Sequence, residues 1–235
     1  MDEVVSRILT DQAGKVLFED NADTPQNPAS LTKMMTLYIV FRDLALDRWI
    51  TVPEKAVVRR IPGKVPQSNM GLRAGQRVSV MDLVLGMIVP SANDAAATIA
   101  QTVAPGGFVE MLNQEGRALG LASTRFASPS GLGDGTTNVR DMALLARQLW
   151  AVFPQYRSLY SVGSFAFNGK TLKTTNTLLD QRPSLVGMKT GTLPNLRRHL
   201  AAIDQQETGT TVAVVMNAAN RKQRDALTAE VLNRT

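Results

Sequence analysis

The sequence predicts an α+β fold in which both ends of the chain contribute to one sheet and the middle forms a mostly helical second lobe. Strand-like stretches occur near the N-terminus and again in the last third of the chain, and amphipathic helical patterns fill the part between them. A chain of 235 residues suffices for one sizeable core with a smaller attached lobe. We therefore expect one domain over 1–235, with a sheet lobe from 1–53 and 155–235 and a helical lobe from 54–154.

The first elements are a hairpin and a helix. Two strand-like stretches, 4–9 and 15–19, flank the turn signal Asp-Gln-Ala-Gly at 11–14, which predicts a hairpin. Apolar residues then recur at helical spacing over 30–47, and Pro28 suits the start of that helix.

The middle of the chain predicts loops and four helices. The stretch 54–75 is rich in glycine, proline and basic residues without a clear period, so we expect a loop with short strand pieces. The stretch 128–138 contains several glycines and a proline and also predicts irregular structure. The predicted helices cover 80–89, 94–103, 108–119 and 139–152.

The last third of the chain returns to strand-like patterns and closes with a helix. Strand-like stretches at both ends of a sequence with helices between them are typical of a sheet interrupted by a helical insertion. The predicted strands cover 164–167, 185–190, 199–204 and 210–216, and the predicted helix covers 225–232.

Composition excludes several classes of site. Cysteine is absent, so the chain forms neither disulfides nor thiolate metal sites. His199 is the single histidine, which rules out most histidine-based metal clusters and leaves little room for a Ser-His-Asp triad. We interpret it as a strand residue near the rim of the site rather than as a ligand, and we expect no metal and no cofactor.

The net charge of +6 fits either a mildly basic surface or attraction to an anionic substrate or envelope polymer. The basic residues are scattered and lack interleaved aromatic residues, which disfavours nucleic acid as a partner. No apolar run approaches the roughly 18–20 residues of a membrane span, and no leader sequence is visible. A cytosolic protein and a mature exported domain without its leader both fit this composition.

Ser30 and Lys33 are the first candidate catalytic pair. On a helix, positions i and i+3 share a face with β-carbons about 5–6 Å apart. A lysine at this spacing can act as the base for a serine nucleophile if burial and a second cation lower its pKa. The start of a helix also offers free backbone N–H groups to a developing oxyanion. Capping of the helix is the alternative role of Ser30.

Ser91 and Asn93 lie on a predicted turn directly after Pro90. A hydroxyl and an amide two residues apart on a turn can point to the same place, relay a proton and hold a substrate amide. Turn propensity alone also explains both residues, and Asn93 or Asp94 could cap the next helix.

A third motif, Lys189-Thr190-Gly191, stands at the end of a strand-like stretch. Lys189 would supply the second cation, and Gly191 would let a substrate backbone approach the strand edge. Each motif is a weak signal alone. In this order the three match the S-x-x-K, S-D-N and K-T-G signature of β-lactamases and penicillin-binding proteins, with Ser-Ala-Asn as the middle motif here.

With these motifs the chain resembles the D-alanyl-D-alanine carboxypeptidases, the low-molecular-mass penicillin-binding proteins, along most of its length. The resemblance implies a β-lactamase/DD-peptidase-like fold with an antiparallel sheet flanked by helices. It implies a serine-type enzyme that removes the terminal D-alanine of peptidoglycan stem peptides, is acylated by penicillins, serves cell wall biogenesis and cell shape, and is exported to the periplasm or cell envelope. The stretches that carry the resemblance are 28–36, 70–75, 91–96, 113–121, 128–132 and 187–191.

The resemblance also assigns catalytic roles. Ser30 is the nucleophile and Lys33 its base. Ser91 passes a proton to the departing D-alanine amine, and Asn93 orients Lys33 and the substrate. Lys189 completes the electrostatic network around these groups.

Substrate binding is implied for the end of the same strand. The backbone N–H groups of Ser30 and Thr192 would form the oxyanion hole. Arg224 matches the arginine that holds the terminal carboxylate of the substrate, although by charge alone Arg221, Lys222 or Arg224 could serve. The residues implied along the strand edge are Thr190, Gly191 and Thr192.

The chain departs from the family pattern after Gly191. The family usually has a threonine two residues on, followed by an Ala-Gly pair, whereas this chain has Thr-Leu-Pro-Asn-Leu-Arg at 192–197. This stretch borders the site, so we expect it to affect substrate preference. Many members continue into a β-rich domain and an amphipathic anchor helix that these 235 residues do not contain, so membrane attachment is not inferred.

Three alternatives share the nucleophile or the fold. A β-lactamase would need a glutamate that positions water for deacylation, and Glu110 to Asn113 resembles its Glu-x-x-Leu-Asn loop with a spacing one residue too short. A DD-endopeptidase or transpeptidase would differ in the acceptor of the acyl group. A non-catalytic penicillin-binding module would keep the fold and bind without turnover.

Overall fold

The computed structural model describes residues 4–58 and 67–234. One five-stranded sheet with the order β2-β1-β9-β8-β7 dominates it, and every neighbouring pair in this sheet is antiparallel. The sheet thus joins the N-terminal hairpin to the last third of the chain, as the sequence predicts. Its strands are β1 (Ser6–Asp11), β2 (Val16–Asp20), β7 (Leu185–Thr192), β8 (Arg198–Gln206) and β9 (Gly209–Ala218).

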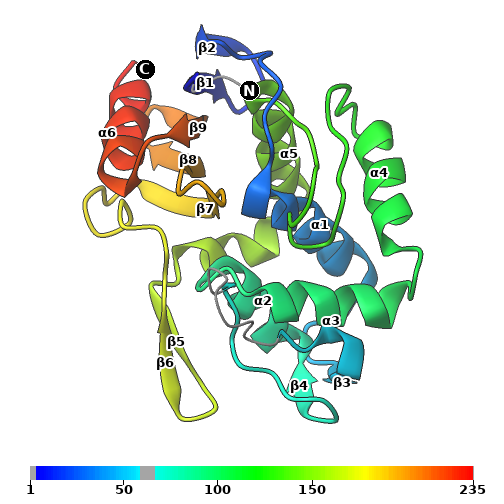
Figure 1. The fold of residues 1–235 in the computed structure, drawn as a ribbon. Helices are drawn as coiled ribbons and strands as arrows, with labels where there is room; N and C mark the ends of the chain where they lie inside the picture. Colours follow the sequence, from blue (N-terminus) through cyan, green and yellow to red (C-terminus); the bar gives the residue numbers. More distant parts are fainter. Residues whose placement is uncertain (1–3, 59–66, 235) are drawn as a thin grey trace.

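The central strands of the sheet are buried on both faces. In β9, Val212 and Val214 belong to one hydrophobic core, whereas Ala213 between them belongs to the other. Helix α6 (Arg221–Leu232) covers one face of the sheet and helix α5 (Val139–Val152) covers the other (Figure 1). Because both faces are covered, these strands appear in the sequence as nearly continuous apolar runs.

Helix α1 (Lys33–Asp43) is the central helix of the structure. Its residues 33–41 are all buried, and it contacts the neighbouring helices α3 and α5. A helix that is apolar around its whole circumference belongs inside a core, so its position follows from its composition. The 3₁₀ helix η1 (Ala29–Thr32) leads directly into it.

Helix α1 is shorter than the predicted helix over 30–47. It ends at Asp43, and Leu44 is extended, with φ −125° and ψ 134°. Leaving the helix here allows Leu46 to become buried, while its carbonyl accepts the N–H of Met81 at 2.8 Å. Tertiary packing against the next helix therefore outweighs the helical pattern of the last turn.

The predicted helices at 80–89, 94–103, 108–119 and 139–152 are present within one or two residues of their expected ends, whereas α6 begins at Arg221, four residues before the predicted start at 225. The sequence did not indicate several short elements whose exposed, charged residues carry little periodicity. The remaining helices are α2 (Val80–Ile88), α3 (Asn93–Val103) and α4 (Phe108–Ala118). The short elements are β3 (Trp49–Thr51), η2 (Glu54–Ala56), β4 (Arg77–Ser79), η3 (Pro154–Ser161) and β6 (Lys170–Lys173). Strand β5 (Ser164–Phe167) has the predicted bounds.

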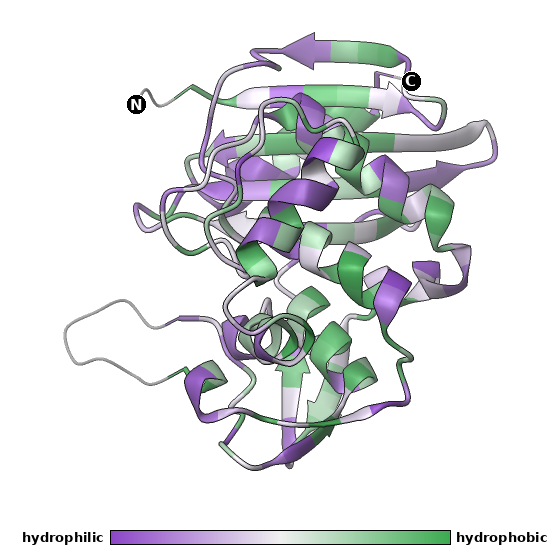
Figure 2. Cartoon of the chain, turned by 90° about the vertical axis from the view of Figure 1, so that its right-hand side faces the viewer, coloured by the Kyte–Doolittle hydropathy of each residue, from purple (hydrophilic) through white to green (hydrophobic). Residues whose placement is uncertain are grey.

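Figure 2 shows the sheet as one layer and a second group of helices with the β3–β4 hairpin beneath it. Helix α5 lies within the predicted helical lobe of 54–154 and packs on the sheet, so one apolar core is continuous between the two groups. The lobe boundaries stay a prediction. Within the described part of the chain, no helix combines the length and the apolarity that crossing a membrane requires.

Candidate active site

Ser30 lies in η1, immediately before the buried helix α1. The side chain of Asn27 fixes this entry, because its Oδ1 accepts the N–H of Ala29 at 2.8 Å. Ala29 adopts a positive φ of 45°, which is uncommon for a residue with a side chain. No side-chain cap hydrogen bond is found at the start of η1 or of α1. Ser30 is half-buried, and its Oγ accepts from Lys33 rather than capping the helix.

Lys33 is fully buried, and its Nζ makes three hydrogen bonds. The acceptors are the Oγ of Ser30 at 2.9 Å, the Oδ1 of Asn93 at 2.7 Å and the carbonyl of Ser130 at 2.9 Å. The predicted spacing of Ser30 and Lys33 thus brings both groups into hydrogen-bond contact. Three acceptors match the three protons of an ammonium group.

Ser91 and Asn93 lie on the turn between α2 and α3, and both are buried. Ser91 has a positive φ of 62°, so the turn holds its backbone in a left-handed conformation that serine rarely adopts. The Oγ of Ser91 accepts from the Nζ of Lys189 at 2.9 Å. Asn93 begins α3 and accepts from Lys33, so this one turn connects the two lysines.

Lys189 lies in β7, the last strand of the sheet, and its Nζ also donates to the carbonyl of Thr190 at 2.9 Å. Hydrogen bonds therefore link all five predicted catalytic residues in two groups that meet at the turn between α2 and α3. These groups come from three segments that are far apart in the sequence. They are Ser30, Lys33, Ser91, Asn93 and Lys189.

Burial and charge lower the pKa of both lysines. Burial, followed by the nearby charge of Lys189, places the pKa of Lys33 well below its ordinary value, while Asp94 acts in the opposite direction. Burial and the charge of Arg224 lower the pKa of Lys189 to about 7. A lysine whose pKa is lowered in this way can be neutral near pH 7 and can accept a proton.

The three predicted strand-edge residues have different surroundings. The Oγ1 of Thr190 lies 2.5 Å from the Oγ1 of Thr175. Gly191 lies directly over the His199 ring, which would be 2.9 Å from an added Cβ. The Oγ1 of Thr192 accepts from Nη1 of Arg198 at 2.6 Å.

Arg224 is buried near the start of α6, and its guanidinium is occupied by protein groups. Its Nε donates to Asp225 at 2.8 Å, and its Nη2 donates to Thr177 at 3.2 Å. The Nη2 of Arg224 also forms an ion pair with Oδ1 of Asp225 at 2.6 Å. The predicted contact between Arg224 and a substrate carboxylate stays a prediction, and these bonds favour a structural role.

Several residues at the site were not assigned a role from the sequence. The carboxylate of Asp94 accepts the N–H groups of Met70, Gly71 and Leu72 at 3.0 Å each, which ties that segment to the start of α3. In the sequence, such a residue is visible only as a short polar side chain beside a motif. Turn propensity alone also explains side chains of this kind. The carbonyl of Ser130 lies within the stretch 128–132 that carries the family resemblance.

His199 is fully buried in β8. Its Nε2 lies 3.1 Å from the carbonyl of Asn27, and its Nδ1 accepts the N–H of Asn217 at 2.9 Å. The ring therefore joins the entry to η1 to strands β8 and β9. The sequence predicted His199 near the rim of the site, whereas the structure buries its ring completely, and both ring nitrogens have hydrogen-bond partners.

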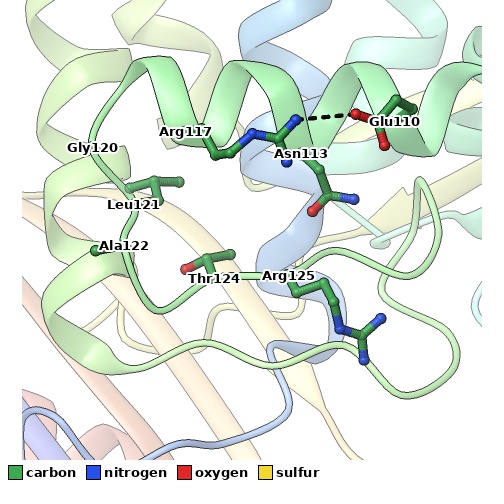
Figure 3. Close-up of a pocket in the computed structure, with 8 residues that line it drawn as sticks. All are labelled: Glu110, Asn113, Arg117, Gly120, Leu121, Ala122, Thr124 and Arg125. Carbon is green, nitrogen blue, oxygen red and sulfur yellow. Dashed lines mark hydrogen bonds and ion pairs between the residues drawn. The ribbon is translucent and has the colours of Figure 1, made fainter.

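A separate hollow of about 510 Å³ lies beside α4 and contains none of the predicted site residues. Figure 3 shows Arg117 paired with Glu110 along the helix, and the Asn113 side chain is held by the backbone of Phe126. Glu110 and Asn113 thus lie on a helix, as their pattern predicts, and not on a loop facing Ser30. The lining residues are Glu110, Asn113, Arg117, Gly120, Leu121, Ala122, Thr124 and Arg125.

The sequence profile of the S11 peptidase family, described as D-alanyl-D-alanine carboxypeptidase, matches residues 3–220. The chain belongs to this family. A curated relative, D-alanyl-D-alanine carboxypeptidase DacD of Escherichia coli K12, is 37% identical over 224 residues, which are 90% of this chain and 57% of the relative. The chain therefore spans less than two thirds of the length of this relative.

Two solved structures resemble the whole chain. Penicillin binding protein 6B from Escherichia coli has a TM-score of 0.88 and 35% identity, covering 97% of this chain and 76% of that one. Penicillin-Binding Protein D2 from Listeria monocytogenes, solved with cefotaxime bound, has a TM-score of 0.86 and 26% identity, covering 97% of this chain and 95% of that one. These similarities confirm the predicted β-lactamase/DD-peptidase-like fold class.

Proposed function

We propose that this chain is the catalytic domain of a serine-type D-alanyl-D-alanine carboxypeptidase. It would remove the terminal D-alanine from peptidoglycan stem peptides that end in D-Ala-D-Ala. The observation that carries the proposal is the 2.9 Å contact between Nζ of the buried Lys33 and the Oγ of the half-buried Ser30. The family membership of the chain supports the substrate class.

The first step is acylation of Ser30. Neutral Lys33 accepts the hydroxyl proton while Oγ attacks the carbonyl carbon of the penultimate D-alanine. The backbone N–H groups of Ser30 and Thr192 would stabilise the oxyanion. Lys33 keeps its bonds to Asn93 and Ser130 in either protonation state, so it can accept and return a proton without moving.

Departure of D-alanine needs a proton on its amine. Ser91 donates its hydroxyl proton to that nitrogen and is reprotonated from Lys189, which contacts Ser91 Oγ at 2.9 Å. The products are free D-alanine and an ester on Ser30. The proton that Lys33 took from Ser30 then returns to Lys189 by way of Ser91, which makes Lys33 neutral again. Water attacks the ester while Lys33 accepts its proton, and Lys33 passes this proton to the Ser30 Oγ as the shortened peptide leaves.

The substrate is proposed to lie along β7, which ends the sheet order on that side. An extended peptide can add to such an edge through main-chain hydrogen bonds. Thr190, Gly191 and Thr192 lie where the strand approaches Ser91 and Ser30, and they would bind its backbone. Peptidoglycan lies outside the cytoplasmic membrane, so we infer that the chain acts in the periplasm or cell envelope.

We also propose that residues 1–235 act as one catalytic unit. A continuous core, which includes residues of β9, α1 and α3, supports this reading. A β-lactam presents a strained amide to the same nucleophile, so penicillins should acylate Ser30. The similarity to a structure that holds cefotaxime supports this extension.

Intact mass spectrometry after incubation with penicillin tests the proposal, with Ser30→Ala as the control. A long-lived adduct of one penicillin on the unsubstituted protein, absent from Ser30→Ala, is expected. Release of D-alanine from a peptide ending in D-Ala-D-Ala should be lost in the same variant.

Other outcomes identify the alternatives. Hydrolysed penicillin without a lasting adduct indicates a β-lactamase. An adduct together with transfer to an amine, or cleavage of a cross-linked peptide, indicates a transpeptidase or an endopeptidase. Reversible binding that survives Ser30→Ala indicates a non-catalytic module, and failure to bind penicillin at all refutes the enzyme assignment.

A further inference from the structure

Thr36 lies one turn beyond Lys33 on helix α1, and its side chain is fully buried. Its Oγ1 donates to the carbonyl of Pro129, 93 residues further along the chain, at 2.7 Å. A threonine inside a helix commonly bonds the carbonyl four residues before it, and the threonines of α3 and α6 do so. They are Thr98, Thr102 and Thr228, each at 2.8 Å. The hydroxyl of Thr36 therefore binds a distant loop instead of its own helix.

The next carbonyl of the same loop contacts Lys33. The carbonyl of Ser130 accepts from its Nζ at 2.9 Å, so two consecutive carbonyls of the loop both point at α1. The N–H of Gly131 donates to the Oγ of Ser128 at 3.0 Å, which closes a turn around them. The Pro129 carbonyl and the Ser130 nitrogen belong to one planar peptide unit. The bond from Thr36 thus fixes the plane from which the Ser130 carbonyl projects.

The position of this carbonyl determines the orientation of the base. A neutral lysine has two protons and one lone pair on Nζ. When Asn93 Oδ1 and the Ser130 carbonyl accept the two protons of Lys33, the lone pair faces the third contact, the Oγ of Ser30. If the Ser130 carbonyl withdraws, a proton of Lys33 can turn to that Oγ instead. The lone pair then no longer faces the hydroxyl that it must deprotonate.

We propose that Thr36 is a positioning residue for Lys33. Its hydroxyl holds the peptide plane of Pro129 and Ser130 so that the Ser130 carbonyl binds one proton of the neutral amine. This role rests on the proposed function, in which neutral Lys33 is the base. Because Thr36 is fully buried, it does not contact substrate. Its effect is therefore on the rate of proton transfer and not on the affinity for a ligand.

Thr32 provides a matched control in the same region. Its side chain is fully buried, and its Oγ1 would lie 3.0 Å from a Cβ added to Gly131, so it also faces the loop. Among the described residues, however, this hydroxyl has no hydrogen-bond partner. Thr32→Val thus removes a buried hydroxyl beside the same loop without removing a hydrogen bond.

Penicillin acylation, followed by intact mass over time at several penicillin concentrations, separates binding from reaction. Thr36→Val keeps the shape of the side chain and should lower the acylation rate constant by about 3- to 10-fold, the effect of one lost hydrogen bond. The dissociation constant of the non-covalent penicillin complex should change by less than about twofold. Thr32→Val should leave both constants unchanged. A loss of folded protein would lower the final amount of adduct and not the rate constant.

Thr36→Ser separates the hydrogen bond from the packing. Serine keeps the hydroxyl but lacks the buried methyl group, so this variant should be less stable in urea than the unsubstituted protein. Its acylation rate constant should nevertheless match that of the unsubstituted protein. An unchanged rate constant in Thr36→Val, a slow Thr36→Ser, or an equal loss in Thr32→Val overturns the proposal.

Release of D-alanine from a peptide ending in D-Ala-D-Ala distinguishes this role from the proposed function. If penicillin acylation depends on Thr36 but no D-alanine is released, the carboxypeptidase assignment fails and the role of Thr36 stands. If Thr36→Val releases D-alanine as fast as the unsubstituted protein, the role of Thr36 fails and the carboxypeptidase stands. If the unsubstituted protein neither reacts with penicillin nor releases D-alanine, Ser30 is not activated and both fail.

Discussion

At the scale of single residues, the charge of Lys189 acts on the protonation of Lys33. Both are buried, and the charge of Lys189 contributes to the lowered pKa of Lys33. A neutral Lys33 can direct its lone pair at the Ser30 hydroxyl and its two protons at Asn93 and Ser130. The second cation therefore activates the base without touching the nucleophile.

Replacing Lys189 with methionine should therefore shift the pH dependence of acylation. Acylation requires neutral Lys33, so its rate should rise with pH as Lys33 loses its proton. Without the charge of Lys189, the pKa of Lys33 rises. The rising limb of the plot of acylation rate against pH should therefore move to higher pH. The rate of penicillin adduct formation, measured by mass between pH 5 and 10, reports this limb. A variant that is merely slower at every pH, with the limb unmoved, would contradict the electrostatic role.

At the scale of elements, the loop 128–132 supports the nucleophile through close backbone contact. Gly131 has a positive φ of 87°, and a Cβ built there would lie 1.7 Å from the carbonyl oxygen of Ala29. That carbonyl immediately precedes Ser30. Gly133, two residues further along the chain, has a similar φ of 88°, but its added Cβ would lie 3.7 Å from the nearest atom, in Ala127.

Gly131→Ala and Gly133→Ala should therefore differ although both introduce the same backbone strain of about 1–2 kcal/mol. The clash at Gly131 must displace Ala29, so we expect a further loss of about 1–3 kcal/mol in the free energy of unfolding. Penicillin acylation should slow in Gly131→Ala and stay normal in Gly133→Ala. Urea denaturation and adduct formation measure the two effects. Equal behaviour of the variants would show that the contact with Ala29 does not position Ser30.

The elements that the sequence predicted best are those with buried faces. Strands β7, β8 and β9 and helices α2 to α5 carry long apolar patterns, and they lie where these patterns predict them. Strand β6 was missed because its sequence Lys-Thr-Leu-Lys is largely exposed and lacks two-residue alternation. The end of α1 was misplaced because Leu46 packs in a core contact that no local pattern encodes.

At the scale of the whole molecule, motifs predicted which residues meet but not how the basic residues near the end of β7 are paired. Ser30, Ser91 and Lys189 could be brought together from motif order alone. The strand register that sets Arg198 opposite Thr192 and the ion pair of Arg224 with Asp225 could not be predicted in this way. Both facts arise only after the sheet has assembled.

The titration of the single histidine, His199, makes the free energy of unfolding depend on pH. Burial lowers the pKa of His199 to about 4 from its ordinary 6.5, although its contacts with Arg198 and Asn27 act in the opposite direction. Because the folded-state pKa is lowered, the unfolded chain takes up a proton first as the pH falls. The contribution of His199 to stability is therefore complete above about pH 6.5 and decreases between pH 6.5 and 4, with a loss of about 2 kcal/mol at pH 5.

His199→Gln should remove this dependence because glutamine keeps a donor and an acceptor but does not titrate. The difference in unfolding free energy between the unsubstituted protein and the variant, from urea denaturation, should decrease by about 2 kcal/mol from pH 8 to pH 5. Titration of carboxylates such as Asp204 is common to both proteins and cancels in this difference. Parallel stability curves would mean that the pKa of His199 does not differ between the folded and unfolded chains, so that the ring is protonated at pH 5 in the folded state as well. Its Nδ1 could then not accept the Asn217 N–H at that pH.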